Sequence, residues 1–445
     1  MFPSRLPLLL SLSTLALGLS AAAPAGAAPL DRIPEPTAPG PYIVVYESGV
    51  ADPLEKTRGV ERRLGVRSRA RFSRAVEGFA GTLTPRQVRA LGDDPQVAYI
   101  APDRPRSIAG SVALRSGETA PTGTRRIGAA TTSTTREAAT AGVAVVDTGV
   151  DLDHPDLAVG AGRDCTGTGS ADDDNGHGTH VAGSIGARNT GAGVVGVAPG
   201  TTIHPVKVLD AAGGGTDSEV ICGLDWVAGN ARALRIGVAN LSLGGPGVDD
   251  GACGARAFDP LHAAICKLTD GGVNVVVAAG NENVDLGGVA PAAYPEVLTV
   301  AAMSDSDGVR GGTGGTSACG RPDDTFADFS NYATAAADAA HTIAAPGVCI
   351  TSTARGGGYA RMSGTSMAAP HVAGIVASCL GEAGAAGPCT GLTPGAVIAK
   401  LRGDARDRLA RDPASGFAGD PSRPVDGRVY GPLAWAGSAS TSPSS

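Results

Sequence analysis

The stretch GVAVVDTGVDLDHPDL (Gly142–Leu157) joins an unbroken apolar run to a polar segment that begins at Asp147. An apolar run of this length is typical of a strand that is buried on both faces of a sheet. Comparable runs recur along the chain with helical stretches between them, at Gly142–Val146, Ile203–Val208, Val238–Leu243, Val273–Ala279, Val297–Ala302 and Thr342–Ala345. This alternation predicts an α/β fold, a doubly wound and mostly parallel sheet with helices on both faces.

Polar residues follow these strands where such sheets bind ligands, beyond the carboxyl ends. Asp147 ends the first strand, and Asn281 ends another in VVVAAGNEN. His177 and Ser366 stand at expected helix starts, in DDDNGHGTHVAG and SGTSMAAPHVAG. Each has an ordinary structural explanation, because Asp, Asn and Ser cap helices or form turns and a histidine near a helix start is usually structural. His180, one turn further, is expected to point into the packing.

Taken together, the four residues predict nucleophilic catalysis. Serine becomes a good nucleophile only when a base takes its proton and a third group holds that base. Asp147 would orient His177, and His177 would take the Ser366 proton and later give it to a leaving amine. The N-terminus of the serine helix favours developing negative charge, and the Asn281 side-chain amide would donate to the oxyanion.

The motifs VVDTG, GHGTHVAG, AAGN and GTSMAAPHVAG, in this order, resemble those of the subtilase serine peptidases, nearest to the proteinase K-like secreted branch. The resemblance spans residues 124–437 and implies a subtilisin-like serine endopeptidase of broad specificity, with Asp147, His177, Ser366 and Asn281 at the catalytic positions. A catalytically silent binding module would normally lack one of these four. An esterase would need a GxSxG elbow and the order Ser, Asp, His.

The resemblance also implies where a substrate binds. NLSLGGP matches the strand beside the specificity pocket, with Ser242, Leu243 and Gly244 pairing to substrate backbone, and Gly213, Gly214 and Gly215 match the opposite edge. Glycines let an extended peptide come close enough for main-chain pairing, which tolerates many sequences. Ala278 and Gly280, with Ala279 between them, would form a small uncharged pocket wall that favours apolar side chains, and Glu282 at its rim could admit basic ones.

Catalysis by this mechanism needs no cofactor, but the resemblance implies structural calcium. The backbone carbonyls of Pro295 and Val297 in PAAYPEVLTV match a family calcium site. The aspartate that completes that site is missing, because Thr342 stands in its place and Asp338 is displaced by an insertion. The acidic segments 304–308 and 323–328 could supply carboxylates, although acidic loops are commonly only solvated.

A basic unit precedes the body of the chain. Residues 41–106 carry 12 Lys+Arg and 8 Asp+Glu, which gives a net charge of +4. Residues 107–445 carry 22 Lys+Arg and 33 Asp+Glu, which gives a net charge of −11. The expected elements are strand 42–46, helix 55–64, a strand pair over 71–83 with a turn near Gly78, helix 84–92 and strand 97–103. This β-α-β-β-α-β order predicts a small ferredoxin-like α+β unit, which resembles the family's inhibitor propeptide. We expect it to act as chaperone and inhibitor until the enzyme cuts within the connector 107–123, between about Arg106 and Glu118.

The first 27 residues read as a secretory signal peptide, with Arg5, an apolar run and a small-residue cleavage site at Ala25–Ala27. The 8 cysteines all follow it, and no CxxC pair occurs, which favours disulfides over zinc. The sequence does not fix their pairing, although neighbouring positions favour Cys253–Cys266, Cys319–Cys349 and Cys379–Cys389, which would leave Cys165–Cys222. We therefore expect a secreted, monomeric zymogen that acts on proteins and binds neither nucleic acid nor membranes, with a disordered tail at 438–445.

Overall fold

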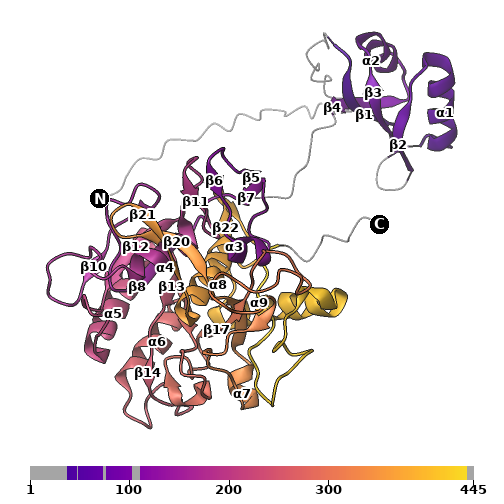
Figure 1. Cartoon of the computed structure of the whole chain (residues 1–445). Coiled ribbons are helices and arrows are strands. Elements are labelled where there is room, and N and C mark those ends of the chain that lie inside the picture. Colours follow the sequence, from indigo (N-terminus) through magenta and orange to yellow (C-terminus); the bar gives the residue numbers. More distant parts are fainter. Residues whose placement is uncertain (1–37, 48, 74–76, 103–110, 438–445) are drawn as a thin grey trace, which may run out of the picture. The chain divides into compact units, whose positions relative to one another are not determined.

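The structure is a computed structural model that describes residues 38–47, 49–73, 77–102 and 111–437. The predicted signal peptide, the predicted tail and the first part of the connector lie outside these residues. The chain forms two compact units, which are described separately, one ending at residue 107 and the other comprising the rest (Figure 1). Within the described residues, no helix combines the length and the apolar character needed to cross a bilayer.

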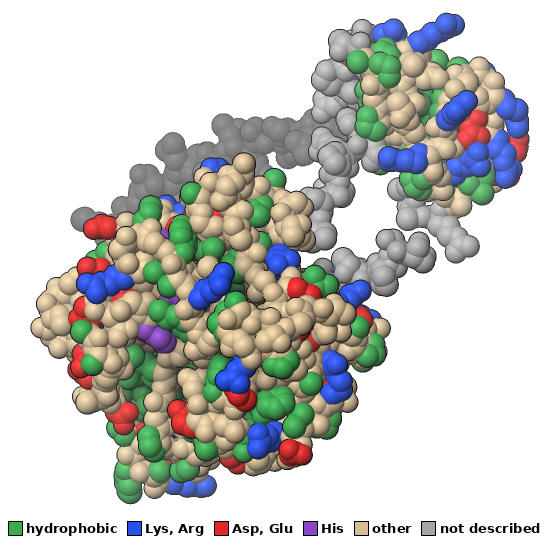
Figure 2. Space-filling view, viewed as in Figure 1, with side chains coloured by type: hydrophobic (Ala, Val, Ile, Leu, Met, Phe, Trp, Pro, Cys, Tyr) green, Lys and Arg blue, Asp and Glu red, His purple; other side chains and the backbone are tan. Residues whose placement is uncertain are grey.

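The small unit has the predicted β-α-β-β-α-β order. Its elements are β1 (Gly40–Tyr46), α1 (Pro53–Leu64), β2 (Ser68–Ser73), β3 (Glu77–Leu83), α2 (Pro85–Gly92) and β4 (Val97–Pro102). They form an antiparallel sheet in the order β2-β3-β1-β4 over a core of its own. Thr84 and Gln87 form a capping box that starts α2. Lys and Arg side chains crowd one side of this unit in Figure 2.

The predicted strand pair is present as β2 and β3, which are joined by residues 74–76, and Gly78 itself is the second residue of β3. A Cβ atom at this position would lie 2.0 Å from the Val44 carbonyl oxygen of the paired strand β1. The glycine therefore permits close packing of two strands, a role that local sequence does not distinguish from a turn.

The large unit is built on a nine-stranded, mostly parallel sheet with β10, β12, β8, β13, β15, β17 and β18 in this order, where β9 also pairs with β12 and β19 with β17. The strands are β8 (Gly142–Asp147), β9 (Ala158–Val159), β10 (Arg163–Asp164), β12 (Thr202–Lys207), β13 (Ile236–Leu241), β15 (Asn274–Ala278), β17 (Leu298–Ser304), β18 (Thr325–Phe326) and β19 (Thr342–Pro346). All six predicted strands are present, and only β18 runs antiparallel to its neighbour.

Helices cover both faces of this sheet, as predicted. Along β8, Val143 and Val145 join one core with α4 (His177–Gly186), α8 (Thr365–Leu380) and α9 (Pro394–Arg411). Ala144 and Val146 join the other core with α5 (Asp217–Leu234) and α6 (Pro260–Asp270). Alternate side chains of one strand therefore enter opposite cores, which is why the strand reads as an unbroken apolar run.

Short elements complete the unit. They are β5 (Ser111–Ala113), β6 (Glu118–Thr119), α3 (Thr122–Arg126), β7 (Thr134–Arg136), β11 (Gly193–Val194), β14 (Gly245–Pro246), β16 (Val289–Ala290), α7 (Ala336–Ala339), β20 (Ile350–Ala354), β21 (Gly358–Met362), β22 (Gly381–Glu382), β23 (Ala385–Ala386) and the 3-10 turns Leu286–Gly288 and Pro413–Ser415. Within the expected connector, residues 112–119 are exposed or half-buried, but two short strands pair with the body, β5 with β7 and β6 with β11. Their partners are distant in the sequence, so no local pattern reveals the pairing.

All eight cysteines form disulfides, and the expected pairing is confirmed. The bonds are Cys165–Cys222, Cys253–Cys266, Cys319–Cys349 and Cys379–Cys389. They close loops of 57, 13, 30 and 10 residues and so restrict the unfolded chain to very different degrees.

Candidate active site

Asp147 and His177 meet at the carboxyl edge of the sheet. Asp147 is fully buried at the end of β8, and His177 is the first residue of α4. His177 Nδ1 lies 2.7 Å from Asp147 Oδ1, and the Thr148 backbone N–H donates to the same oxygen. The carboxylate charge raises the pKa of His177, burial of the ring opposes this effect, and the Asp173 charge adds to it. Because the carboxylate accepts from Nδ1–H, Nε2 is free to take a proton.

A network around Asp173 fixes the first turn of α4. This buried carboxylate accepts from the backbone N–H groups of Asn175, Gly176 and Thr179 and from the Thr148 hydroxyl. The Thr148 hydroxyl oxygen accepts from the N–H of the residue after His177. Asp173 thus satisfies N–H groups at the start of the helix and ties it to β8.

Glycines bring α4 against the end of β8. A Cβ atom on Gly178 would lie 2.0 Å from the Gly149 carbonyl oxygen and 3.2 Å from the Asp147 side chain. On the other side of His177, Gly176 has φ +113°, a conformation that other residues rarely adopt. The glycines that flank His177 therefore serve a close approach and a turn.

Ser366 lies in the first turn of α8, and a proline gives it an unusual link to the sheet. Pro370 has no N–H to bond the Ser366 carbonyl in the helix. The Ser242 hydroxyl donates to that carbonyl instead, at 2.9 Å. In return, the Ser366 hydroxyl donates to the Ser242 carbonyl, at 3.2 Å. Within the described part of the chain, no hydrogen bond joins Ser366 to His177, a bond that is often long before substrate binds.

Thr365 orients the side chain of Asn281. The Asn281 carbonyl oxygen accepts from the Thr365 backbone N–H, at 2.8 Å, and from its hydroxyl, at 3.0 Å. The same hydroxyl accepts from the Gly280 N–H. These bonds occupy the oxygen of the Asn281 amide and leave its NH₂ group for another acceptor.

Two adjoining cavities contain most of the predicted substrate residues. The larger, about 920 Å³, is lined by His177, by Gly213–Gly215 and by Ser242–Gly244. The smaller, about 390 Å³, is lined by Ser366 and Asn281, again by Ser242–Gly244, and by Ala278, Gly280 and Glu282. The strip Ser242–Pro246 is a wall of both, so the two cavities adjoin, with His177 lining the larger and Ser366 the smaller.

Three other predicted residues have different surroundings. Ala279 is buried and lines neither cavity. Glu282 lines the smaller cavity, but its carboxylate accepts from the Asn281 backbone N–H and from Asn331. His180 points into the packing as expected, where it contacts the Ile350 carbonyl and burial lowers its pKa to about 4.

Pro295 and Val297, whose carbonyls are the predicted calcium ligands, line neither cavity. Val297 is buried, and its carbonyl is in hydrogen-bonding contact with the buried ring of His341. Burial lowers the pKa of His341 to about 4, so a neutral ring stands at this carbonyl. Pro295 and Val297 remain predicted ligands.

Sequence reasoning missed Thr148, Asp173 and Thr365, which hold the predicted residues in place. Asp173 had a readable signal, since an acidic residue shortly before a helix start is a common cap. Thr148 and Thr365 adjoin Asp147 and Ser366 in the sequence but bond to segments far along the chain, which no local pattern predicts.

Comparisons with known proteins show the family to which the chain is similar. Residues 139–412 match a model described as the subtilase family, and residues 47–109 match one described as peptidase inhibitor I9. A subtilisin-like protease of Coccidioides posadasii is 35% identical, over 82% of this chain and 88% of the relative. The alkaline serine protease ver112 of Corniculantispora psalliotae is also 35% identical, over 87% of this chain and 92% of the relative. Subtilisin E of Bacillus subtilis is 35% identical, over 77% of this chain and 80% of the relative. A solved structure entitled "Crystal structure of a cold adapted subtilisin-like serine proteinase" is 30% identical, over 71% of this chain and 97% of that chain, with a TM-score of 0.49.

Proposed function

Since the chain belongs to the subtilase family and is a subtilisin-like serine protease with an I9 propeptide domain, we propose that Asp147, His177 and Ser366 are its catalytic residues and that Asn281 supplies the oxyanion donor. The observation that carries this proposal is the 2.7 Å contact between His177 Nδ1 and Asp147 Oδ1, at a cavity that shares the wall Ser242–Pro246 with the cavity that Ser366 lines.

In the first half of the reaction, Ser366 Oγ attacks the peptide carbonyl carbon while its proton passes to His177 Nε2. Asp147 stabilises the imidazolium that results. The tetrahedral intermediate then collapses, the C–N bond breaks, and His177 returns the proton to the departing amine. An acyl ester on Ser366 remains.

In the second half, a water molecule gives a proton to His177 and its oxygen attacks the acyl carbon. The ester C–O bond breaks, the proton returns to Ser366, and the carboxylic acid product leaves. Negative charge forms on the carbonyl oxygen in both halves. The Asn281 NH₂ group, held by Thr365, is preorganised to donate to that oxygen.

Broad specificity is part of the proposal. Gly213–Gly215 and Ser242–Gly244 line the same cavity and can pair with an extended peptide through the main chain, which reads little of its sequence. Ala278 and Gly280 give the smaller cavity an uncharged wall, so we expect apolar side chains before the cut bond. The bonds of Glu282 to Asn331 and to its own loop reduce its capacity to attract basic side chains.

We further propose secretion as a self-processed, monomeric zymogen. Four disulfides are typical of an exported protein. The charges of the two units, +4 and −11, favour docking of the propeptide on the enzyme. Because Ser111–Ala113 pair with β7 and Glu118–Thr119 with β11, cleavage before Ser111 would leave these strands with the enzyme. We therefore narrow the proposed cleavage region to residues 106–111.

A structural calcium ion completes the proposal. Carboxylate oxygens of Asp305, Asp307 and Asp323 lie within 4.8 Å of one another, and oxygen ligands suit calcium. Asp305 is buried, and its Oδ1 has no hydrogen-bond partner but lies 3.6 Å from Arg126 Nε. Burial raises the pKa of Asp305 to about 7, although the Arg126 charge opposes this rise. A hard cation would stabilise the ionised carboxylates there, and it would take no part in catalysis.

The test is the intact mass of the purified precursor and of its Ser366→Ala variant, each with and without an organofluorophosphate. We expect the wild type to lose about its first hundred residues and to gain one adduct on Ser366, and the variant to do neither. A correctly folded wild type that stays full length and unlabelled would refute the catalytic assignment.

A further inference from the structure

Two carboxylates line the larger cavity, whereas Ser366 lines only the smaller one. They belong to Asp217, the first residue of α5, and to Asp259, which directly precedes α6. Among the described residues, no Lys or Arg lines this cavity. Burial raises the pKa of Tyr294, another lining residue, and the charges of Asp259 and Asp217 raise it further. Both carboxylates therefore make the same part of the cavity negative.

The Asp217 carboxylate is not needed to begin α5. Thr216 precedes the helix, and the Glu219 carboxylate accepts from the Thr216 backbone N–H at 2.8 Å and from its hydroxyl at 2.7 Å. Asp217 is exposed, and within the described part of the chain its carboxylate has no hydrogen bond or ion pair. The helix dipole favours a negative charge here, but it does not occupy the carboxylate oxygens. Both oxygens are therefore open to a ligand in the cavity.

Asp217 also lies beside a strip that is proposed to pair with substrate. Gly213–Gly215 line the same cavity, and Asp217 follows two residues after this strip. The strip is held by Asp210, whose carboxylate accepts from the Gly214 N–H and whose own N–H donates to the Gly214 carbonyl. A peptide whose main chain pairs with the strip would carry its side chains past the Asp217 carboxylate.

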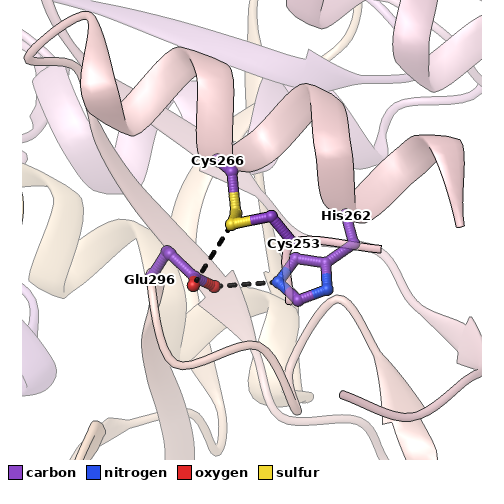
Figure 3. Close-up of side chains that lie close together, drawn as sticks. All are labelled: Cys253, His262, Cys266 and Glu296. Carbon is purple, nitrogen blue, oxygen red and sulfur yellow. Dashed lines mark hydrogen bonds and ion pairs between the residues drawn. A yellow bond between two sulfur atoms is a disulfide. The ribbon is translucent and has the colours of Figure 1, made fainter. Parts of the chain in front are cut away.

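The part of the wall that contains Asp259 is held by α6. The Asp259 carboxylate accepts from two backbone N–H groups in the first turn of this helix and from a tyrosine hydroxyl. Figure 3 shows two further connections. The Cys253–Cys266 disulfide joins the preceding loop to α6, and Glu296 Oε2 lies 2.9 Å from Nε2 of His262 on that helix. This wall is therefore preorganised, and Asp259 contributes charge while its oxygens are already engaged.

We propose that Asp217 selects a basic substrate side chain, that of lysine or arginine, at a position two to five residues before the cut bond. This inference rests on the proposed function and names a substrate preference for the same site. The positive group would pair with Asp217. Its carbon stem would lie on the apolar lining, which includes the half-buried Leu209 and Leu243 and the 90% exposed Phe258.

The position follows from the division between the two cavities. Ser366, Ala278 and Gly280 line the smaller cavity, which we expect to receive the side chain next to the cut bond. Asp217 lines only the larger cavity. An extended peptide advances about 3.3 Å per residue, so a side chain that reaches Asp217 comes from further along the substrate.

An apolar side chain is the competing occupant of the larger cavity. Such a side chain would cover the lining equally well, but it would also remove water from the Asp217 carboxylate without providing a partner. A lysine or arginine side chain covers the same apolar surface and brings an opposite charge to the carboxylate. The unpaired carboxylate at the edge of an apolar lining therefore favours a basic occupant.

The experiment compares peptide pairs that carry arginine or citrulline at one position, two to five residues before the cut bond. Citrulline has the shape of arginine without its charge, so the ratio of the two kcat/KM values isolates the effect of charge. Each enzyme is expressed as the full chain, its concentration is fixed by active-site titration, and mass spectrometry confirms the cut bond. At low ionic strength we expect a ratio of about 3 to 5 at one position, the upper range for an exposed ion pair. The ratio should approach 1 in Asp217→Asn.

Two controls separate a local contact from the overall charge. Asp225→Asn removes the same charge from an exposed position of α5 that does not line the cavity, and it should keep the wild-type ratio. Asp217→Glu restores the carboxylate and should recover a preference for arginine. About 1 M NaCl should lower the wild-type ratio toward 1, because salt screens exposed charges, and this measurement needs no variant to fold.

The outcomes distinguish this inference from the proposed function. The inference is overturned if the wild-type ratio stays near 1 at all four positions, if it does not respond to salt, if Asp217→Asn keeps it, or if Asp225→Asn loses it. A wild type that cleaves the citrulline peptides without preferring arginine overturns the inference alone. A wild type that cleaves none of the peptides refutes the proposed function, and the inference with it.

Discussion

Gly178→Ala tests whether the catalytic geometry depends on close contact between α4 and β8. The new Cβ atom would lie 2.0 Å from the Gly149 carbonyl oxygen, and real Cβ atoms do not approach closer than 3.0 Å. The helix and the strand must therefore separate by at least 1.0 Å. His177 directly precedes Gly178, so a movement of this size at His177 lengthens its 2.7 Å bond to Asp147 beyond hydrogen-bonding range.

The expected cost follows from that displacement. A misplacement of about 1 Å costs roughly 10²-fold in rate. The upper limit on the loss of rate is the effect of removing the aspartate completely. In subtilisin itself that removal lowers kcat by about 3 × 10⁴-fold, which is a known value and was not obtained from this structure. We expect kcat/KM to fall by about 10² to 10⁴-fold, or roughly 2.7–5.4 kcal/mol of transition-state stabilisation.

The assay compares kcat/KM on a peptide substrate for wild type, Gly178→Ala and Gly229→Ala, with enzyme concentration fixed by active-site titration. Gly229 lies within α5, and a Cβ atom there has no neighbour within 4 Å. Gly229→Ala should keep full activity and gain about 0.5–1 kcal/mol of stability. If folded Gly178→Ala kept kcat/KM within threefold of wild type, the reasoning from close contact would be wrong.

Three further predictions concern the base, the oxyanion donor and the disulfides. The neighbouring carboxylate raises the pKa of His177 above 6.5, and the base must be neutral, so activity should fall on acidification at a midpoint above pH 6.5 in a kcat/KM profile. Thr365→Val removes the hydroxyl that holds Asn281, at a cost of about 1–3 kcal/mol, so kcat should fall about 5 to 150-fold with little change in KM. Replacing Cys165 and Cys222 with alanine opens a loop of 57 residues and should reduce stability by about 4 kcal/mol in a denaturant titration of the inactive serine variant, where self-digestion cannot contribute. A midpoint at or below pH 6.5, an unchanged kcat or an unchanged unfolding curve, respectively, would contradict each one.

The main sheet could be predicted because its strands are buried on both faces and read as apolar runs. Each of the six predicted strands lies within two residues of its observed bounds, as for Gly142–Val146 and β8 (Gly142–Asp147). Short strands such as β5 and β6 escaped prediction because two or three residues carry too little pattern and their partners are distant in the sequence. Gly78 shows a different limit of local pattern, since glycine serves both turns and close contacts between strands, and Gly78 lies at such a contact just after the connection between β2 and β3.

The site could be predicted as residue types but not as a network. Asp147, His177 and Ser366 could be proposed from the sequence because nucleophilic catalysis by serine requires these three side-chain types together. The hydrogen bonds that hold these side chains could not be predicted, because a hydroxyl or a buried carboxylate can bond in many directions. The Ser242–Ser366 pair illustrates this, since it depends on a proline one turn further along α8 that leaves a carbonyl free.

The positions of the supporting residues explain why short motifs describe this site so well. Thr148 follows the aspartate and bonds to the helix that carries the histidine. Gly178 follows the histidine and lets that helix approach the strand. Thr365 precedes the serine and holds the amide of the oxyanion donor. In each case one residue belongs to the proposed catalytic set, and its neighbour in the chain contacts a different segment of that set. Because adjacent residues share a backbone, movement of either displaces both, so substitutions at these neighbours should reduce kcat/KM without altering any group that reacts.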